Sequence, residues 1–108
     1  MTTQLHILDE LYQVILSRKE AAPESSYTAA LLHKGVDKIL KKVGEEATEV
    51  VIAGKGGTEH ELIYESADLC YHLLILLAAR GVPADAVWSE LARRFGTSGI
   101  AEKASRKE

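Results

Sequence analysis

The stretch Glu59–Arg80, with the sequence EHELIYESADLCYHLLILLAAR, decides the fold. Between Leu62 and Ala79, fourteen of eighteen residues are apolar, and neither glycine nor proline interrupts them. A helix whose apolar residues lie on nearly every side is typical of a buried core helix. We therefore expect one helix over about residues 59–80, covered by the rest of the chain.

The residues on either side of this helix predict its limits and its neighbours. Thr58 and Glu61 form a capping box, and Gly81 is a usual residue just past a helix end. The glycine-rich residues 54–58 predict a turn between two helices. The spacing of apolar residues predicts further helices over about residues 4–19, 27–33 and 36–53, and a last helix that Pro83 opens and Gly96 ends. No segment alternates like a strand, so the expected fold is all-α, a helical bundle of four to five helices.

The length of the chain limits what this bundle can bury. With 108 residues, we expect one domain, residues 1–108, with a mobile tail over residues 97–108. A chain of this size buries only about two thirds of the surface that its unfolded form exposes. The apolar surface of the central helix needs more cover than one short chain offers, which predicts a homodimer that completes the bundle.

Composition and charge exclude several classes of protein. The net charge of −3 argues against a nucleic-acid module with a broad basic surface. The longest apolar run, residues 73–79, is shorter than the roughly 20 residues of a membrane span. The N-terminus lacks the pattern of a signal peptide, and the one cysteine, Cys70, reads as a small buried hydrophobic residue. A cytoplasmic protein is expected.

Two acidic pairs, Glu46/Glu49 and Glu65/Asp68, lie on consecutive predicted helices. Glu65 and Asp68 share a stripe with His72 on the otherwise apolar central helix, within about 60° of one another. Ionised carboxylates in apolar surroundings cost several kcal/mol unless they are paired or bind a metal, so these pairs need a compensating positive charge.

Two sources of that charge remain open. Lysines such as Lys38 and Lys42 on the preceding helix would give a structural ion-pair network. A divalent cation shared by all four carboxylates is favoured, because four negative charges exceed what two lysines neutralise. Oxygen-only ligands suit Mg²⁺, with Mn²⁺ as a substitute, and Mg²⁺ usually takes phosphate oxygens as further ligands. His72 is predicted to form hydrogen bonds between helices, or else to hydrogen-bond to a metal ligand and support it.

The residues around the acidic pairs resemble a known family. The acidic motifs resemble those of the all-α MazG-type nucleotide pyrophosphohydrolases, and the flanking residues resemble the phosphoribosyl-ATP pyrophosphatase family of histidine biosynthesis. The motifs that carry this resemblance are 26–29 (SYTA), 35–39 (GVDKI), 41–47 (KKVGEEA), 64–69 (YESADL), 71–74 (YHLL) and 102–106 (EKASR). The resemblance implies hydrolysis of 1-(5-phosphoribosyl)-ATP to 1-(5-phosphoribosyl)-AMP and pyrophosphate, second in the pathway. The phosphoribosyl-AMP cyclohydrolase would be a separate chain.

The resemblance also implies roles for individual residues. The metal ligands would be Glu46, Glu49, Glu65 and Asp68, and the catalytic residues Glu45, Glu46 and Glu49. Glu45 would orient the attacking water, although its position on the helix also allows a simple pair with Lys41. The substrate-binding residues would be Lys38, Lys42, Lys103 and Arg106. Two alternatives stay open: a related nucleoside triphosphate pyrophosphohydrolase of other specificity, and a non-catalytic helical dimerisation module.

Overall fold

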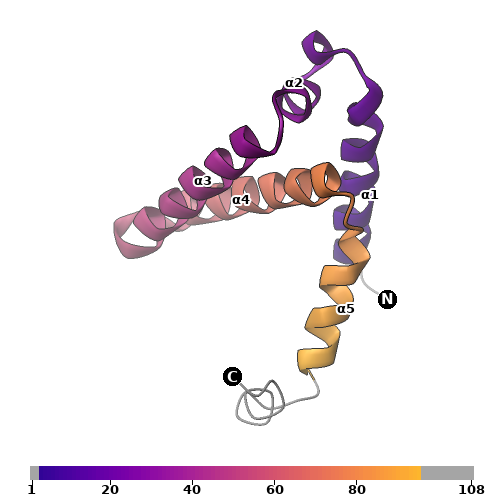
Figure 1. Ribbon diagram of the computed structural model, residues 1–108. Helices are drawn as coiled ribbons and strands as arrows, with labels where there is room; N and C mark the ends of the chain where they lie inside the picture. The colour runs from indigo at the N-terminus through magenta and orange to yellow at the C-terminus, as the bar shows by residue number, and fades with distance from the viewer. Residues whose placement is uncertain (1–2, 96–108) are drawn as a thin grey trace, which may run out of the picture.

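The computed structural model describes residues 3–95, and all regular secondary structure in this range is helical (Figure 1). The helices are α1 (Thr3–Ser17), α2 (Tyr27–Lys34), α3 (Val36–Gly56), α4 (Glu59–Arg80) and α5 (Ala84–Phe95). Two single turns of 3-10 helix, Arg18–Glu20 and Pro23–Ser25, connect α1 to α2. No strand occurs between residues 3 and 95, so the expected all-α class is confirmed.

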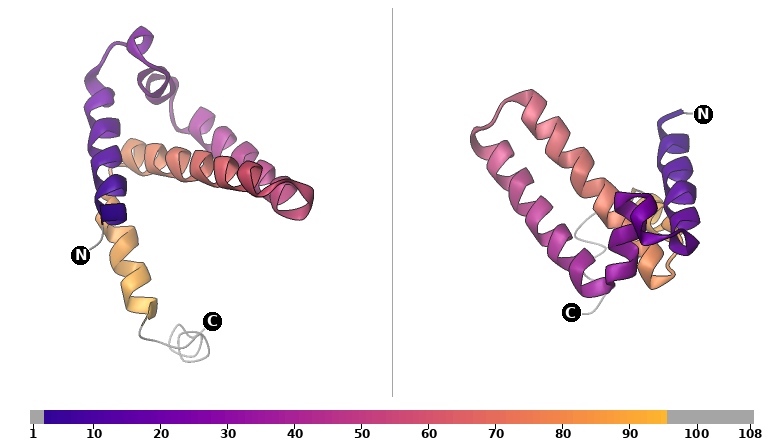
Figure 2. Two further views of the ribbon diagram at one scale, coloured as in Figure 1. Left: turned by 180° about the vertical axis from the view of Figure 1, so that it is seen from behind. Right: turned by 90° about the horizontal axis from the view of Figure 1, so that it is seen from above.

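Helices α3 and α4 form a long antiparallel hairpin that positions the acidic residues (Figures 1 and 2). The Thr58 hydroxyl accepts a hydrogen bond from the Glu61 amide at 3.1 Å, and the Glu61 carboxylate accepts one from the Thr58 amide at 2.9 Å. This capping box starts α4 where the sequence predicts it. Helix α4 then ends at Gly81, whose φ of 71° is a left-handed conformation that glycine adopts without strain.

The predicted turn over residues 54–58 is shorter than expected. Helix α3 continues through Gly54 to Gly56, and only Gly57 and Thr58 lie outside the helices. The Gly57 amide donates to the Ala53 carbonyl at 2.9 Å, which closes the last turn of α3. A Cβ at Gly57 would lie 2.6 Å from a Glu61 carboxylate oxygen and 3.0 Å from the Ala53 carbonyl oxygen, so a side chain does not fit between the cap and the helix end.

The hydrophobic core lies at one end of the hairpin, where α1 and α2 meet the C-terminal half of α4. The largest fully buried side chains are Ile15, Ile39 and Ile75, from α1, α3 and α4. Two long-range hydrogen bonds fix α1 and the turn after it to the end of α4. The Tyr12 hydroxyl donates to the Val82 carbonyl at 2.5 Å, and Lys19 donates to the Ala78 carbonyl at 2.9 Å.

The expectation that the whole of residues 59–80 would be buried is wrong for the chain taken alone. Buried residues of α4 begin at His72, whereas Ile63 and Tyr64 are 61% and 63% exposed. Cys70 is exposed too, contrary to its expected burial. The cause is geometric: the first half of α4 packs only against α3, because α1 and α5 reach only its second half (Figure 2).

By length and composition alone, α4 is apolar enough to cross a membrane, although its uninterrupted apolar run is short. One such helix is a weak indication, since the core helix of a soluble protein passes the same test. Only 22% of its most apolar stretch is buried inside this chain. The described fold therefore leaves a long apolar helix with one open side.

The second half of α4 also carries an apolar groove toward α1 and α5, with a volume of about 260 Å³. Its lining is almost wholly aliphatic and aromatic, from Leu8, Cys70, Leu73, Leu74, Leu76, Leu77, Val87 and Trp88. The indole nitrogen of Trp88 is buried there, and no atom of residues 3–95 accepts its hydrogen bond.

Candidate metal and phosphate site

Glu46 of α3 and Asp68 of α4 face each other across the hairpin, with His72 one turn further along α4. Each of the three residues offers a side-chain nitrogen or oxygen, and these atoms lie within 4.8 Å of one another. Glu46 is the buried carboxylate, at 7% exposure, while Asp68 is half-buried. The buried carboxylate of this group thus comes from α3, because α3 turns Glu46 toward α4.

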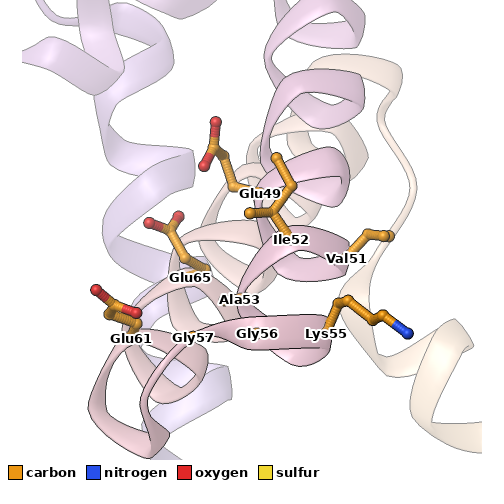
Figure 3. A pocket seen from close by; sticks show the side chains of 9 residues that line it. All are labelled: Glu49, Val51, Ile52, Ala53, Lys55, Gly56, Gly57, Glu61 and Glu65. Atoms are coloured by element: carbon orange, nitrogen blue, oxygen red, sulfur yellow. The ribbon is translucent and has the colours of Figure 1, made fainter.

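Glu49 and Glu65 extend this acidic group toward the hairpin tip. Partial burial, followed by the negative charges of Glu49, Glu46 and Asp68, raises the pKa of Glu65 above its ordinary value. Figure 3 shows the carboxylates of Glu49 and Glu65 on the same side of the hairpin, whereas Lys55 points away. The four carboxylates named from the sequence are thus brought close enough to repel one another.

An open cleft of about 680 Å³ runs from these carboxylates toward the hairpin tip (Figure 3). Glu49 and Glu65 line it together with Ile52, Val51 and the glycines at the end of α3. Glu61 also lines the cleft, although it was not among the predicted site residues. Its carboxylate already caps α4, which was the role that its spacing from Thr58 indicated.

His72 offers no free nitrogen to a metal. Its Nδ1 lies 2.8 Å from the Asp68 carbonyl oxygen, which can only accept, so Nδ1 carries the proton. The other ring nitrogen, Nε2, lies 2.7 Å from the Tyr27 hydroxyl and accepts its hydrogen bond. The donors left for a cation are therefore carboxylate oxygens from both helices, a set that fits Mg²⁺ or Mn²⁺ better than zinc.

Lysine neutralises only part of the acidic group. Lys42 lies 3.3 Å from the Glu46 carboxylate and 3.6 Å from that of Glu45, and its hydrogen bond to Glu46 is the main cause that raises the pKa of Lys42. Glu45 is exposed and pairs with Lys42, where the sequence suggested Lys41. Among residues 3–95, no lysine or arginine forms an ion pair with Glu49, Glu65 or Asp68.

A second, basic groove adjoins the acidic group at the start of α3. It has a volume of about 220 Å³ and is lined by Tyr27, Leu31, Lys34, Lys38, Lys41, Lys42 and Glu45. Lys38 and Lys42, the two substrate-binding lysines predicted in this part of the chain, are thus brought together. Lys34 and Lys41 belong to the same run of lysines but were not among the predicted substrate-binding residues, and Tyr27 was not predicted as a site residue. The clustering of four lysines within residues 34–42 was the signal for the first two.

The other two predicted substrate-binding residues, Lys103 and Arg106, lie outside the described residues, as does the predicted tail over residues 97–108.

Fold and site together define a class: an all-α protein whose helix hairpin carries an acidic centre suited to a divalent cation, beside a groove suited to phosphate. The chain matches the family model described as phosphoribosyl-ATP pyrophosphohydrolase over residues 8–95. A phosphoribosyl-ATP pyrophosphatase of Trichlorobacter lovleyi is 82% identical, with all of both chains covered. The phosphoribosyl-ATP pyrophosphatase of Geobacter sulfurreducens is 68% identical, and the match covers 94% of this chain and 94% of the relative. That of Azospirillum brasilense is 54% identical, and the match covers 94% of this chain and 91% of the relative.

The family model covers well over half of the chain, and each of these three relatives is more than half identical to it. The chain therefore belongs to the phosphoribosyl-ATP pyrophosphohydrolase family, and it is an enzyme of the hydrolase class. The all-α fold agrees with the wider MazG-type group that the acidic motifs resemble.

Proposed function

We propose that this chain hydrolyses 1-(5-phosphoribosyl)-ATP to 1-(5-phosphoribosyl)-AMP and pyrophosphate, with Mg²⁺ as its cofactor, as the second step of histidine biosynthesis. The names of the relatives support the substrate. The observation that carries the proposal is the acidic centre itself. Four carboxylates lie near one another, the pKa of Glu65 is raised, and only Lys42 offsets them among residues 3–95.

The acidic and the basic residues would have different roles. Glu46, Glu49, Glu65 and Asp68 would hold the cation. When bound, Mg²⁺ supplies positive charge that offsets the charge on the phosphate oxygens and on the departing pyrophosphate. Lys38 and Lys42 line the adjoining groove and would bind phosphate oxygens, with Lys34 and Lys41 adding to the positive field.

Glu45 is the least constrained of the proposed catalytic residues. Its carboxylate is exposed, lines the lysine groove and pairs with Lys42, and Lys42 also pairs with Glu46. Binding of a cation to Glu46 would release Lys42 toward phosphate, and Glu45 would then be free to orient water at the edge of the groove. The roles of Lys103 and Arg106 in closing over substrate stay predictions.

The homodimer, the cytoplasmic location and a separate cyclohydrolase chain are part of the same proposal. The open side of α4 supports the dimer, since Ile63 and Tyr64 are more than half exposed within one chain. Hydrolysis adds one water to the bond between the α- and β-phosphates, so the pyrophosphate leaves and the phosphoribosyl-AMP goes to the next enzyme.

The test is pyrophosphate release from phosphoribosyl-ATP, measured with Mg²⁺ and with excess EDTA. We expect release only with Mg²⁺, and we expect Glu49→Gln and Asp68→Asn to lower kcat/KM by at least about 100-fold, the upper end of the loss seen when a residue supporting a metal ligand is removed. Glu10→Gln, which removes an exposed charge of α1, is the matched control and should leave the rate unchanged.

Two results would contradict the proposal. Faster turnover of deoxynucleoside triphosphates than of phosphoribosyl-ATP would favour a related enzyme of other specificity. Equal and weak Mg²⁺ binding by the natural chain, Glu49→Gln and Asp68→Asn would contradict the proposed role of Glu49 and Asp68 as metal ligands.

A further inference from the structure

Tyr27 and His72 form a hydrogen-bonded chain that ends on a proposed metal ligand. His72 is only 3% exposed, and its ring lies between α2 and α4. The Tyr27 hydroxyl donates to His72 Nε2 at 2.7 Å, and His72 Nδ1 donates to the Asp68 carbonyl at 2.8 Å. His72 Nδ1 also lies 3.4 Å from an Asp68 carboxylate oxygen. Both ring nitrogens therefore connect the Tyr27 phenol to Asp68.

Tyr27 itself belongs to the lysine groove more than to the core. It is 53% exposed and lines the groove beside Lys38 and Lys42. A tyrosine kept only for packing would bury its ring, whereas here the ring is accessible and the hydroxyl points inward to His72. Tyr27 thus stands at the boundary between the phosphate groove and the carboxylates, and the charges of Lys42, Asp68 and Glu46 all act on its phenol.

A second link between the same helices provides the comparison. The next residue of α2, Thr28, hydrogen-bonds through its hydroxyl to the Tyr71 hydroxyl, and Tyr71 directly precedes His72. The rings of Tyr27 and Tyr71 both contact His72 edge-on, with centroids 5.7 Å apart in each case. The two tyrosines therefore make equivalent links between α2 and α4. Of the two phenolic hydroxyls, only that of Tyr27 hydrogen-bonds to the His72 ring, at Nε2, while Nδ1 of the same ring faces Asp68.

We propose that Tyr27 and His72 are positioning residues of the metal site, which fix Asp68 in the orientation that binds the cation and tie it to the lysine groove. The proposal rests on the proposed function. The hydrogen bonds to the Tyr27 hydroxyl and to the main-chain carbonyl of Asp68 hold the His72 ring in one orientation, with Nδ1 3.4 Å from an Asp68 carboxylate oxygen. Such partners of metal ligands commonly control metal affinity. Loss of the Tyr27 hydroxyl frees His72 Nε2, loosens the ring and lets the Asp68 side chain turn away.

The test compares Tyr27→Phe with Tyr71→Phe, because each removes one phenolic hydroxyl and keeps its ring. Mn²⁺ binding is measured directly by electron paramagnetic resonance of the free ion, independently of activity. We expect Tyr27→Phe to weaken Mn²⁺ binding roughly tenfold and to raise the Mg²⁺ concentration for half-maximal activity by the same factor. Because the role is positioning, kcat at saturating Mg²⁺ should return close to that of the natural chain.

Tyr71→Phe should lose thermal stability, since Thr28 is buried and loses its partner, while its Mn²⁺ affinity stays that of the natural chain. Equal Mn²⁺ affinity in the natural chain and Tyr27→Phe would overturn the proposal, and so would equal weakening in both variants, which would make the links merely structural. Absence of Mn²⁺ binding by the natural chain would instead contradict the proposed function, so the two failures are distinguishable.

Discussion

Glu65 shows the electrostatic effect of the acidic group on a single residue. Its surroundings raise its pKa in the folded state, through partial burial and through the neighbouring carboxylates of Glu49, Glu46 and Asp68. Those neighbours come from two helices, so the repulsion exists only when the hairpin is formed. The unfolded chain is free of this repulsion, and the acidic centre therefore opposes folding.

This difference predicts how stability depends on pH without metal. Between the unfolded pKa of about 4.3 and the raised folded value, the folded chain binds more protons than the unfolded chain. The free energy of unfolding should therefore fall as pH rises through this interval. Urea unfolding in EDTA between about pH 4 and pH 8 measures the slope, which Glu65→Gln should reduce. An unchanged slope in Glu65→Gln would show that the raised pKa of Glu65 is not the cause of this pH dependence.

Glu90 predicts the opposite dependence of stability on pH. Hydrogen bonds from Arg93 and Arg94 lower the pKa of Glu90 to about 2, well below its value in an unfolded chain. Its contribution to stability is complete above about pH 4.5 and is lost as the pH falls toward 2. Acid titration of Glu90→Gln should show a smaller loss of stability across that window than the natural chain.

At the scale of single residues, helical spacing predicted the acidic group but not which of its carboxylates is buried. Glu46 and Glu49 share one side of α3, and Glu65 and Asp68 share one side of α4, because each pair is three residues apart. Which carboxylate is buried depends on how α3 rotates against α4, and that rotation is set by contacts that no spacing rule contains. The same limit hid Tyr27, which the break between α2 and α3 at Gly35 brings to the lysine groove.

At the scale of elements, capping residues and glycines predicted most helix boundaries correctly. Helix α4 spans the predicted residues because Thr58, Glu61 and Gly81 each satisfy backbone groups at a helix end. The end of α3 was predicted too early, since glycines at 54 and 56 were read as a turn. Glycine costs only about 1 kcal/mol inside a helix, so two of them do not end it while its backbone hydrogen bonds continue.

The capping box provides a prediction at this scale. Thr58→Ala removes the hydroxyl that accepts from the Glu61 amide and should lower the free energy of unfolding by about 1 kcal/mol. Thr48→Ala is the matched control, because the Thr48 hydroxyl donates to the Gly44 carbonyl within α3 and caps nothing. It should be neutral or slightly stabilising. Equal destabilisation in urea unfolding of both variants would rule out a special role for the cap.

At the scale of the whole molecule, the described chain is too extended to be a complete bundle. Its radius of gyration is 16.0 Å, against the roughly 13 Å of a compact domain of this length. The hairpin projects from the core, and the first half of α4 is open on one side (Figure 1). The sequence predicted a helix covered by the rest of the chain, whereas within residues 3–95 the first half of α4 packs only against α3.

The proposed dimer predicts a mass of twice 11.8 kDa in sedimentation equilibrium at micromolar concentrations. Ile63→Glu places a charge on the open side of α4, where Ile63 is 61% exposed within one chain, and should shift the chain toward monomer, because a charge there is costly to bury. Gln13→Glu adds the same charge at an exposed position of α1 and should leave the mass unchanged. A monomeric natural chain would contradict the dimer.

The placement of Trp88 has an optical consequence. It is the only tryptophan in the chain, and its indole lies in the groove formed by α1, α4 and α5. The emission wavelength of an indole reports the polarity around it, so the tryptophan fluorescence of this protein reports on the apolar groove between α1, α4 and α5. Movement of α1 or α5 away from α4 would therefore be visible in the emission spectrum without an attached dye, from a residue that lies outside the acidic centre.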